Sequence, residues 1–528
     1  MDAPTGLYER VLAAAGGDLP VPRPPRASAS VVPWRRREGR IEVWWLRRGR
    51  DLPFMGGWFA FPGGARDRAD ARLPLKGEPS HVDASAKTPG LPDLELLPDE
   101  ADLAPGIAAC AARELFEEAG ILLGAGRTVP SLEAFRRECL SDSSSFAAGL
   151  AQRGTALDAA RLVFAGRWLT PPFGALRFDN RFFLLAWRAE DGEPLVAPPE
   201  SEEGEWIEPA RALERVASGE ILTAPPILHI LRVLAEDGPE LALPRLRDTE
   251  EANLGPLRRI EFRPGILLFP QAAATLPPST HTNCYLLGDR EAVLVDPGSP
   301  FDSENDKLVR ALAAARDRLG REVTEIWLTH HHPDHVAGVE TMRRALDVPV
   351  AAHAATAERL AERGIAVDRA LAGGEIRRLR SEAGLELALH HTPGHARGHL
   401  AIEVRPGRDL LCGDLVASFG TVVIDPPEGD MDQYLESLRG LRGRGFRTFF
   451  PGHGAPILEV DGKLDEYLDH RLGRERQVLE LWRAGTRAPR DFLPAIYPEV
   501  PAAAHPLAER QVVAHLDRLR RRGEIGGD

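Results

Sequence analysis

The chain has 528 residues, of which 43% are hydrophobic and 27% charged, and its formal net charge is −13. At roughly 150 residues per domain this length predicts three or four domains, and the composition excludes a largely disordered chain. The acidic charge disfavours nucleic acid as a partner, and the absence of a leader-like start or of any window of about 18 apolar residues predicts a cytoplasmic protein without membrane contact.

The first predicted elements are two strands rich in β-branched and aromatic residues, at 29–34 and 41–48, joined by a charged turn. A later strand is predicted at 181–189, a strand-to-helix junction at 204–213 and a closing helix at 225–238. We therefore expect a first domain at residues 27–236. Residues 237–258 have no sustained hydrophobic period and are rich in Pro, Gly and charge, which predicts a linker.

Inside this first domain, the stretch AACAARELFEEAGILL (108–123) predicts a helix with crowded carboxylates. Glu114, Glu117 and Glu118 fall at i, i+3 and i+4, so they share one helix face, where like charges destabilise an isolated helix. A hard divalent cation such as Mg²⁺ would neutralise them. The alternative is an ordinary amphipathic helix, because Arg, Glu and Leu are all good helix formers.

The segment from Arg113 to Ile121 resembles the Nudix box, REUxEExGU, and WFAFPGGARD (58–67) resembles its leading glycine segment. This resemblance implies an α/β/α sandwich in which the three glutamates hold Mg²⁺ or Mn²⁺ against a diphosphate. It also implies that Arg113 orients the glutamates and that Gly63 and Gly64 help to bind the cofactor.

Two departures from the Nudix pattern concern the outer shell of the metal site and the substrate. The box has a glutamate about eight residues before its arginine, where this chain has Pro105, and about 40 residues separate the glycines from the helix. The insertion, and the stretch at 168–183, are similar to those of peroxisomal coenzyme A-type Nudix hydrolases. A coenzyme A derivative or a nucleotide is thus the implied small-molecule substrate.

A second domain, of α/β class, is predicted at residues 259–460, because strand-like and helix-like segments alternate along it. The predicted strands are 282–288, 291–298, 325–330, 348–353 and 385–394, and the predicted helices include 306–320 and 339–347.

The stretch THHHPDHVAG (329–338) follows the third of these strands and has four histidines and an aspartate within six positions. Side chains alternate in direction along an extended segment, so His330 and His332 point the same way, while Asp334 and His335 turn towards a neighbouring position. One loop could therefore supply ligands to two metal ions. The alternative is a polar loop with chance histidines.

This HxHxDH motif, together with HTPGH (391–395), LCGDLV (411–416) and FFPGHG (449–454), resembles the metallo-β-lactamase superfamily. The resemblance implies an αββα sandwich with two Zn²⁺ that share a nucleophilic water. His330, His332 and His395 would hold the first ion; Asp334, His335 and His453 would hold the second, and Asp414 would bridge both. Asp296 in AVLVDPG would support the metal loop. Antibiotic-degrading members use another residue in the second site, so a glyoxalase II-like or nuclease-like hydrolase is the better match.

A third domain is predicted at 465–526 from helical segments at 466–485, 489–497 and 509–525. These resemble the winged-helix domain of a superfamily subgroup that includes the β-lactamase-like endoribonuclease. Residues 468–528 contain eleven arginines against nine acidic residues. The RLRRR run at 518–522 is interpreted either as a phosphate-contacting patch or as a solvated helix end near the C-terminal dipole.

The sequence thus predicts a multidomain α/β hydrolase with two metal sites. Dinuclear zinc would cleave a thioester or other ester, with acyl-coenzyme A as one candidate, and the Nudix domain would cleave a diphosphate. The catalytic residues expected are Asp334, Glu114, Glu117, Glu118 and Arg113. The alternatives are a single-strand endoribonuclease with a nucleotide-acting or nucleotide-sensing Nudix domain, in which RNA is a partner, and a non-catalytic regulator.

Overall fold

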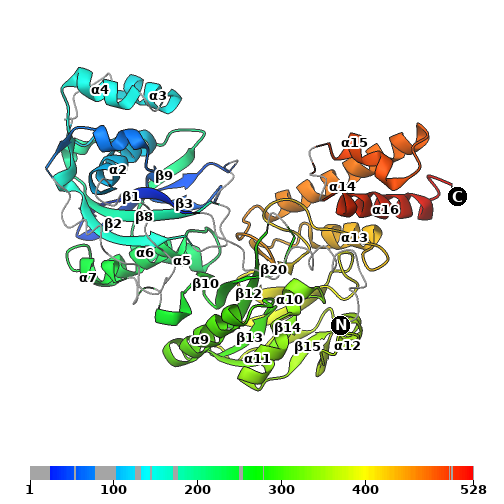
Figure 1. Cartoon of the computed structure of the whole chain (residues 1–528). Helices are drawn as coiled ribbons and strands as arrows, with labels where there is room; N and C mark the ends of the chain where they lie inside the picture. The colour runs from blue at the N-terminus through cyan, green and yellow to red at the C-terminus, as the bar shows by residue number, and fades with distance from the viewer. Residues whose placement is uncertain are drawn as a thin grey trace. The chain divides into compact units, whose positions relative to one another are not determined.

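The computed structural model describes residues 24–526 apart from 51, 53–54, 78–102, 125–131, 143–144, 171–175, 249–251, 253, 277–278, 499 and 501–503. Most of the insertion and part of the 168–183 stretch therefore lie outside the described residues. The described residues form two compact units, one that ends at Phe262 and a second that begins at Arg263 (Figure 1). Within the described part of the chain, every helix is too short or too polar to cross a membrane.

The first unit is built on a seven-stranded sheet with the central order β3-β2-β1-β8-β7, in which β4 pairs with β1 and β9 with β2. Its strands are β1 (Arg26–Arg37), β2 (Arg40–Arg48), β3 (Phe59–Ala60), β4 (Gly63–Ala65), β7 (Val163–Leu169), β8 (Phe178–Ala186) and β9 (Ser201–Ile207), with β5 (Leu75–Lys76) and β6 (Leu157–Asp158) in a separate pair. The two N-terminal strands predicted from the sequence are thus present and pair in antiparallel fashion.

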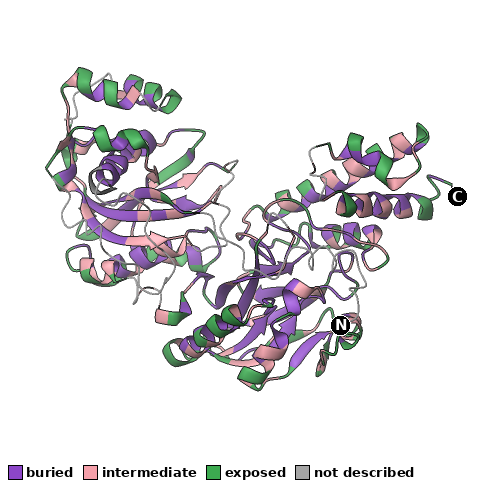
Figure 2. Cartoon of the chain, in the orientation of Figure 1, coloured by how far each residue is buried: buried purple, intermediate pink, exposed green. Residues whose placement is uncertain are grey.

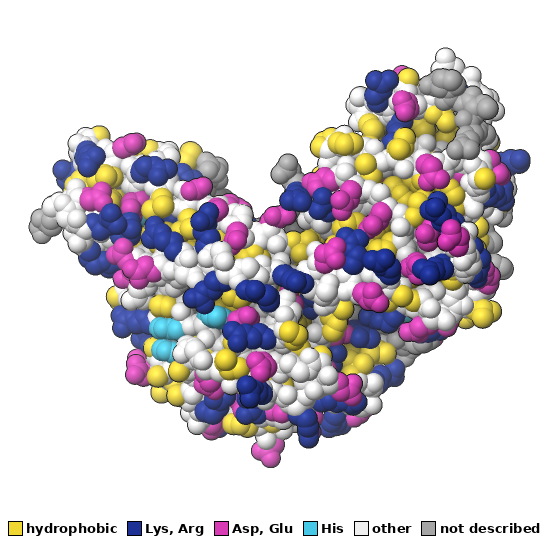
Figure 3. Space-filling view, turned by 180° about the vertical axis from the view of Figure 1, so that it is seen from behind, with side chains coloured by type: hydrophobic (Ala, Val, Ile, Leu, Met, Phe, Trp, Pro, Cys, Tyr) yellow, Lys and Arg dark blue, Asp and Glu magenta, His cyan; other side chains and the backbone are white. Residues whose placement is uncertain are grey.

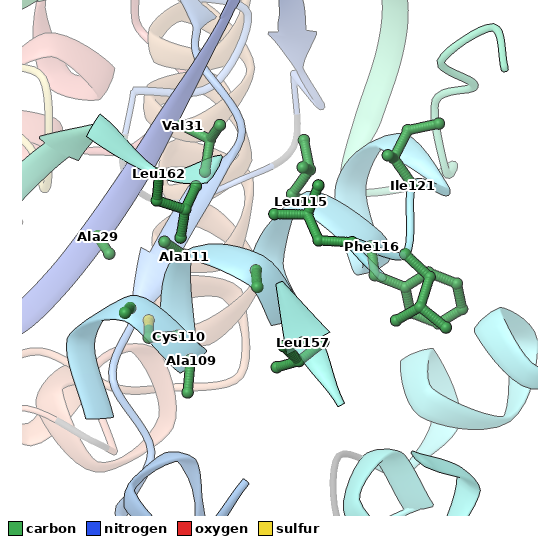
Figure 4. Close-up of a cluster of buried hydrophobic side chains, with 14 of the residues drawn as sticks. Ala29, Val31, Ala109, Cys110, Ala111, Leu115, Phe116, Ile121, Leu157 and Leu162 are labelled. Carbon is green, nitrogen blue, oxygen red and sulfur yellow. The ribbon is translucent and has the colours of Figure 1, made fainter. Parts of the chain in front are cut away.

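Alternation along the strands gives this sheet two apolar faces. On one face, Val31 of β1 and Leu46 of β2 pack in the same core as helix α2 (Leu103–Ala119), whose Leu115 and Phe116 are buried there (Figure 4). The other face is covered by α5 (Pro209–Ala217) and α6 (Pro225–Asp237). Helices on both faces make this unit an α/β/α sandwich, with α3 (Leu132–Ser141) and α4 (Ser145–Arg153) beside α2.

Part of the predicted linker is folded into the first unit. Residues Leu243–Arg247 form helix α7, where Leu246 is buried in the core beneath α6, and Arg247 donates from Nε to the carbonyl of Phe164 on β7 at 3.0 Å. A single turn has too few apolar residues to show a helical period, which is why the sequence pattern indicates a linker.

The second unit contains two sheets. The first has the order β10-β11-β12-β13-β14-β15-β16 and the second β17-β18-β19-β20-β21. The first sheet comprises β10 (Glu261–Arg263), β11 (Ile266–Ala272), β12 (His281–Gly288), β13 (Glu291–Val295), β14 (Glu322–Leu328), β15 (Val350–His353) and β16 (Arg369–Leu371); the second comprises β17 (Ile376–Arg378), β18 (Glu386–His391), β19 (Leu400–Arg405), β20 (Asp409–Gly413) and β21 (Thr448–Pro451).

Helices cover both sheets. On the first sheet lie α9 (Asp302–Leu319), α11 (Val339–Leu346) and α12 (Ala354–Ala361), and the short α10 (Pro333–Val336) carries part of the histidine cluster. The second sheet packs against α13 (Met431–Leu441) and the start of α14 (Val460–Arg483) through Tyr434, Leu438 and Leu464. The central strands are buried almost throughout, as Figure 2 shows.

The described residues of the C-terminal part include α14, α15 (Leu493–Ile496), α16 (His505–Arg521) and the short 3-10 helix Pro489–Phe492. Val478 and Trp482 of α14 pack with Val512 and Leu516 of α16 in a core of their own. This part belongs to the same compact unit as the two sheets, so its contacts with them are defined.

Candidate functional site

The histidine cluster and its distant partners lie at the ends of four strands in the second unit. Thr329–His335 follow β14, His395 follows β18, Asp414 comes directly after β20 and His453 follows β21. Strands β14 and β18 belong to different sheets, so the two sheets together supply the predicted ligands. The predicted ligands among these residues are buried, apart from His332, which is half-buried.

The structure brings the seven predicted ligands together. His330, His332 and His395 form one group whose ligand atoms lie within 4.8 Å of one another, and Asp334, His335 and His453 form another. His331, which the motif leaves out, belongs to neither group, and its carbonyl accepts a hydrogen bond from Arg363 Nη1 at 3.2 Å.

Asp414 lies between the two groups. Its Oδ2 is 3.7 Å from His395 Nε2 and 3.5 Å from His453 Nε2, and its Oδ1 is 3.3 Å from His335 Nε2. A carboxylate in this position faces one histidine of the first group and two of the second. The geometry is therefore compatible with the bridging role expected of Asp414.

The Asp296 carboxylate holds the histidine loop that follows β14. Its Oδ1 accepts from the Thr329 backbone N–H at 2.8 Å, and its Oδ2 accepts from Thr329 Oγ1 at 2.6 Å and lies 2.8 Å from His335 Nδ1. Because Nδ1 of His335 faces this carboxylate, Nε2 is left to face Asp414. The expected supporting position of Asp296 is the one the structure has.

Backbone carbonyls orient two further imidazoles. Nδ1 of His395 lies 2.6 Å from the carbonyl of Val423, and Nδ1 of His453 lies 2.9 Å from the carbonyl of His281. His399 supports Asp414, whose backbone N–H donates to His399 Nε2 at 3.1 Å. Neither the Val423 nor the His281 carbonyl has a sequence signal, because any residue carries one.

The pKa values of the histidines differ between the two groups of ligands. Burial, reinforced by neighbouring histidines, lowers the pKa of His330 and His332 well below the usual value. Burial also opposes the charge on His453, but Asp414 and Asp334 outweigh it and raise the pKa of His453 to about 10. The carboxylates of the second group thus attract positive charge strongly.

This donor set fits a divalent metal ion. Neutral imidazole nitrogens and carboxylate oxygens are ligands that zinc and similar ions prefer. The Nε2 atoms of His330 and His395 are buried and hydrogen-bond to none of the described residues, as is expected of atoms that face a cation.

The glutamates of the first unit also converge, on the face of α2 that meets β4. Glu118 Oε2 accepts from the Gly63 N–H at 2.8 Å. A Cβ on Gly64 would lie 2.4 Å from Glu114 Oε1, so a larger residue there would displace this carboxylate from its place beside β4. The two glycines expected near the cofactor therefore contact the glutamates directly.

Arg113 holds two of these three carboxylates and also that of Asp70. Its Nη1 donates to Glu114 at 2.9 Å and to Glu117 at 2.7 Å, while its Nε and Nη2 donate to the two oxygens of Asp70 at 2.8 and 3.1 Å. Asp70, in the short helix Arg68–Arg72, is the residue that the sequence analysis missed.

Asp70, like the glutamate that the Nudix pattern has there, precedes the arginine in the chain, and it pairs with Arg113. Position 105 holds a proline whose side chain lies outside the described residues, but Asp70 comes six residues after Gly64, before the insertion. Spacing counted forward from the glycines, and not back from Arg113, could have found it.

The glutamate cluster also fits a divalent cation. Burial raises the pKa of Glu114 to about 8 and that of Glu118 to about 7, which shows how poorly the site tolerates so many negative charges. The Glu117 Oε1 atom is buried and hydrogen-bonds to none of the residues that the structure describes. A hard cation with oxygen ligands would neutralise the buried negative charge and would give the Glu117 Oε1 atom a partner.

The arginines of the RLRRR run are paired with carboxylates. Arg518 and Arg521 contact Asp432 of α13 at 2.6 and 2.9 Å, while Arg520 pairs with Asp517 and Arg522 with Glu524. On the face shown in Figure 3, basic and acidic side chains are interspersed. The pairing favours docking of α16 on α13 over contact with phosphates.

Comparison with known families finds three matches along the chain. Residues 9–234 match the NUDT19 Nudix domain, residues 278–453 the metallo-beta-lactamase superfamily, and residues 489–526 the beta-lactamase associated winged helix domain. The predicted architecture and the multidomain α/β fold class are thereby confirmed.

Curated relatives match the second unit. The Beta-lactamase-like protein 2 homolog of Caenorhabditis elegans is 30% identical over 250 residues, which are 46% of this chain and 80% of the relative. The Atrochrysone carboxyl ACP thioesterase of Aspergillus fumigatus is 30% identical over 199 residues, which are 38% of this chain and 58% of the relative. Among solved structures, a metallo-beta-lactamase family protein from Thermus thermophilus matches with 26% identity and a TM-score of 0.41, covering 50% of this chain and 96% of that one.

Proposed function

The chain belongs to the metallo-β-lactamase superfamily, carries a Nudix domain and an associated winged-helix domain, and is a metal-dependent hydrolase. We propose that it hydrolyses two different bonds of one class of small molecule. The second unit would cleave a thioester or ester and the first a diphosphate. The observation that carries this proposal is that one chain holds both a complete His/Asp cluster and a complete glutamate cluster.

In the second unit we assign the ligands as the sequence motif does. His330, His332 and His395 would hold one divalent ion, Asp334, His335 and His453 would hold the other, and Asp414 would contribute to holding both. Such ions, of which zinc is our choice, would supply a hydroxide nucleophile at neutral pH and would polarise the scissile carbonyl. The chain keeps the imidazoles of the first group neutral by burial and fixes the ring of His335 through Asp296.

In the first unit, Glu114, Glu117 and Glu118 would hold Mg²⁺ or Mn²⁺, which would neutralise the diphosphate for attack of water on phosphorus. Arg113, held by Asp70, keeps Glu114 and Glu117 in place. Gly63 and Gly64 allow β4 to lie against these carboxylates.

Acyl-coenzyme A is the substrate class we favour. It contains both a thioester and a diphosphate, so each site could act on it. A relative of the second unit is named as an acyl-carrier-protein thioesterase, and the first unit matches the NUDT19 Nudix domain. The paired arginines of α16 make RNA the weaker candidate.

The test uses the full chain and two site variants, His332→Ala and Glu118→Gln, with His505→Ala and Glu133→Gln as matched controls at exposed positions. Each protein is incubated with acyl-coenzyme A, coenzyme A, nucleoside diphosphate compounds and single-stranded RNA. We expect thioester cleavage to be lost only in His332→Ala and diphosphate cleavage only in Glu118→Gln.

RNA cleavage that disappears in His332→Ala, without any thioester cleavage by the unaltered chain, would replace this proposal by the nuclease alternative. Loss of neither activity in either variant would reject the assigned sites. A salt series separates the two substrates further, because binding to a phosphate backbone weakens steeply as salt rises.

A further inference from the structure

The loop that follows β20 connects two parts of the metal cluster. It begins at Asp414, which lies between the two ligand groups, and reaches Val423, whose carbonyl accepts from Nδ1 of His395 at 2.6 Å. The position of this loop therefore affects both the bridging carboxylate and a histidine of the first group. What holds the loop in place also holds the metal site.

Helix α14 holds the first half of the loop. The backbone N–H of Ala417 donates to the Tyr467 hydroxyl at 3.0 Å, and that hydroxyl donates to the carbonyl of Gly420 at 3.0 Å. One turn further along α14, the buried guanidinium of Arg471 donates to the carbonyl of Val422.

Helix α16 holds the second half. Gln511 clamps the backbone of Ile424 on both sides: its Oε1 accepts from the Ile424 N–H at 3.3 Å and its Nε2 donates to the Ile424 carbonyl at 3.0 Å. The same Oε1 accepts from Arg471 Nη1 at 3.0 Å, and Arg510 pairs with Asp425. Val423 thus lies between two residues, Val422 and Ile424, that the C-terminal helices fix.

We infer that the C-terminal helices are part of the metal centre's support, with Gln511 and Arg471 as positioning residues that act through Val423 on His395. This inference rests on the proposed metal assignment. Partners that orient a metal-binding histidine through its second nitrogen typically change metal affinity 10- to 100-fold when they are removed. Gln511 acts one step further away, so we expect the lower end, about tenfold.

Gln511→Met keeps the length of the side chain but removes both hydrogen bonds to Ile424. Gln511→Glu keeps the acceptor for the Ile424 N–H and for Arg471 but cannot donate to the Ile424 carbonyl. Gln477→Met is the matched control, because Gln477 is exposed on α14 and accepts only from Arg474 among its described contacts. Each full-length variant is titrated with Co²⁺ in excess Mg²⁺, which occupies the glutamate site, and Co²⁺ binding is followed by visible absorption with chelator competition.

We expect Gln511→Met to weaken one of two Co²⁺ ions about tenfold and to alter its absorption spectrum, Gln511→Glu to give a smaller change, and Gln477→Met to match the unaltered chain. Wild-type affinity and spectrum in Gln511→Met would overturn the inference. If circular dichroism shows that Gln511→Met is unfolded, Gln511→Glu takes its place, and wild-type Co²⁺ affinity and spectrum in that variant would overturn the inference. His395→Ala tests the metal assignment separately from the role of Gln511. If this variant binds Co²⁺ as the unaltered chain does, the metal assignment itself fails.

Discussion

Asp296 is a single residue on which much of the metal loop depends. Its carboxylate receives the Thr329 N–H and hydroxyl and faces His335, and its own backbone has φ of 52°, a left-handed conformation that few non-glycine residues adopt readily. We predict that Asp296→Asn lowers metal affinity at the His335 group about 10- to 100-fold, because the amide lacks the negative charge that orients the imidazole.

The measurement for Asp296→Asn is a zinc competition titration. Asp289→Asn is the control, since Asp289 hydrogen-bonds to Ser381 and Ala383, away from the cluster. Equal zinc affinity in Asp296→Asn and in the unaltered chain would contradict the supporting role.

Asp70 has a comparable role in the first unit. The side chains of Arg113 and Asp70 are 8% and 1% exposed, so their ion pair is almost fully buried. Removing Asp70 takes two charge-assisted hydrogen bonds from the buried guanidinium of Arg113, which we expect to cost about 3 kcal/mol. We predict that Asp70→Ala lowers the unfolding free energy of this unit by about that amount and reduces diphosphate hydrolysis.

Urea unfolding measures the effect of Asp70→Ala. Asp67→Ala, in an exposed helix-capping residue of the same segment, should cost about 1 kcal/mol or less. Similar losses in the two variants would mean that the pair with Arg113 contributes no special stability.

At the scale of elements, the contact between α2 and β4 determines whether the glutamates can gather. Any side chain at position 64 would enter the space of Glu114, since a Cβ there lies 2.4 Å from its Oε1. We predict that Gly64→Ala reduces diphosphate hydrolysis at least tenfold by displacing this carboxylate, while thioester hydrolysis is unchanged. Gly440→Ala, at an exposed position of α13 where a Cβ meets nothing within 4 Å, should keep both activities.

Strand β20 begins with a buried acid that should make stability depend on pH. Burial raises the pKa of Asp409 to about 6, although Arg263 lies 3.6 Å away. Since an unfolded Asp titrates near pH ~3.9, the folded state binds the proton more tightly. Asp409 therefore contributes stability below pH about 4, and this contribution is lost as the pH rises through about 6.

We predict that between pH 4 and 7 the unfolding free energy of the unaltered chain changes by about 2 kcal/mol relative to Asp409→Asn, in the direction of lower stability at high pH. Urea unfolding across this range tests it. The exposed variant Asp317→Asn should follow the unaltered chain, and parallel curves for all three proteins would reject the prediction.

At the scale of the whole molecule, the chain has two compact units, each with its own buried core. We predict two calorimetric transitions, of which zinc raises only the one belonging to the second unit. At a zinc concentration 100 times the dissociation constant, binding to the folded state stabilises it by about 2.7 kcal/mol. His332→Ala, which removes one ligand of the first ion, should reduce this shift. An equal shift of both transitions would contradict the assignment of zinc to one unit.

Much of the fold and of the two candidate sites could be predicted from the sequence, because several of the motifs are local. The HxHxDH run lies on one loop and the glutamates on one helix face, and spacing within a single element fixes their common direction. Strands β1, β2 and β14 were predicted because alternation and β-branched residues are local properties as well. The fold class and the family followed from these motifs.

Tertiary structure decided what depends on contacts between distant segments. Asp70 reaches Arg113 across 43 positions and an insertion, helix α7 is stabilised by the core that Leu246 enters, and the arginines of α16 are neutralised by Asp432 of another helix. The support of His395 by Gln511 passes through a backbone carbonyl. No residue pattern marks such a partner, since every residue carries a carbonyl and only the packed fold determines which one meets the imidazole.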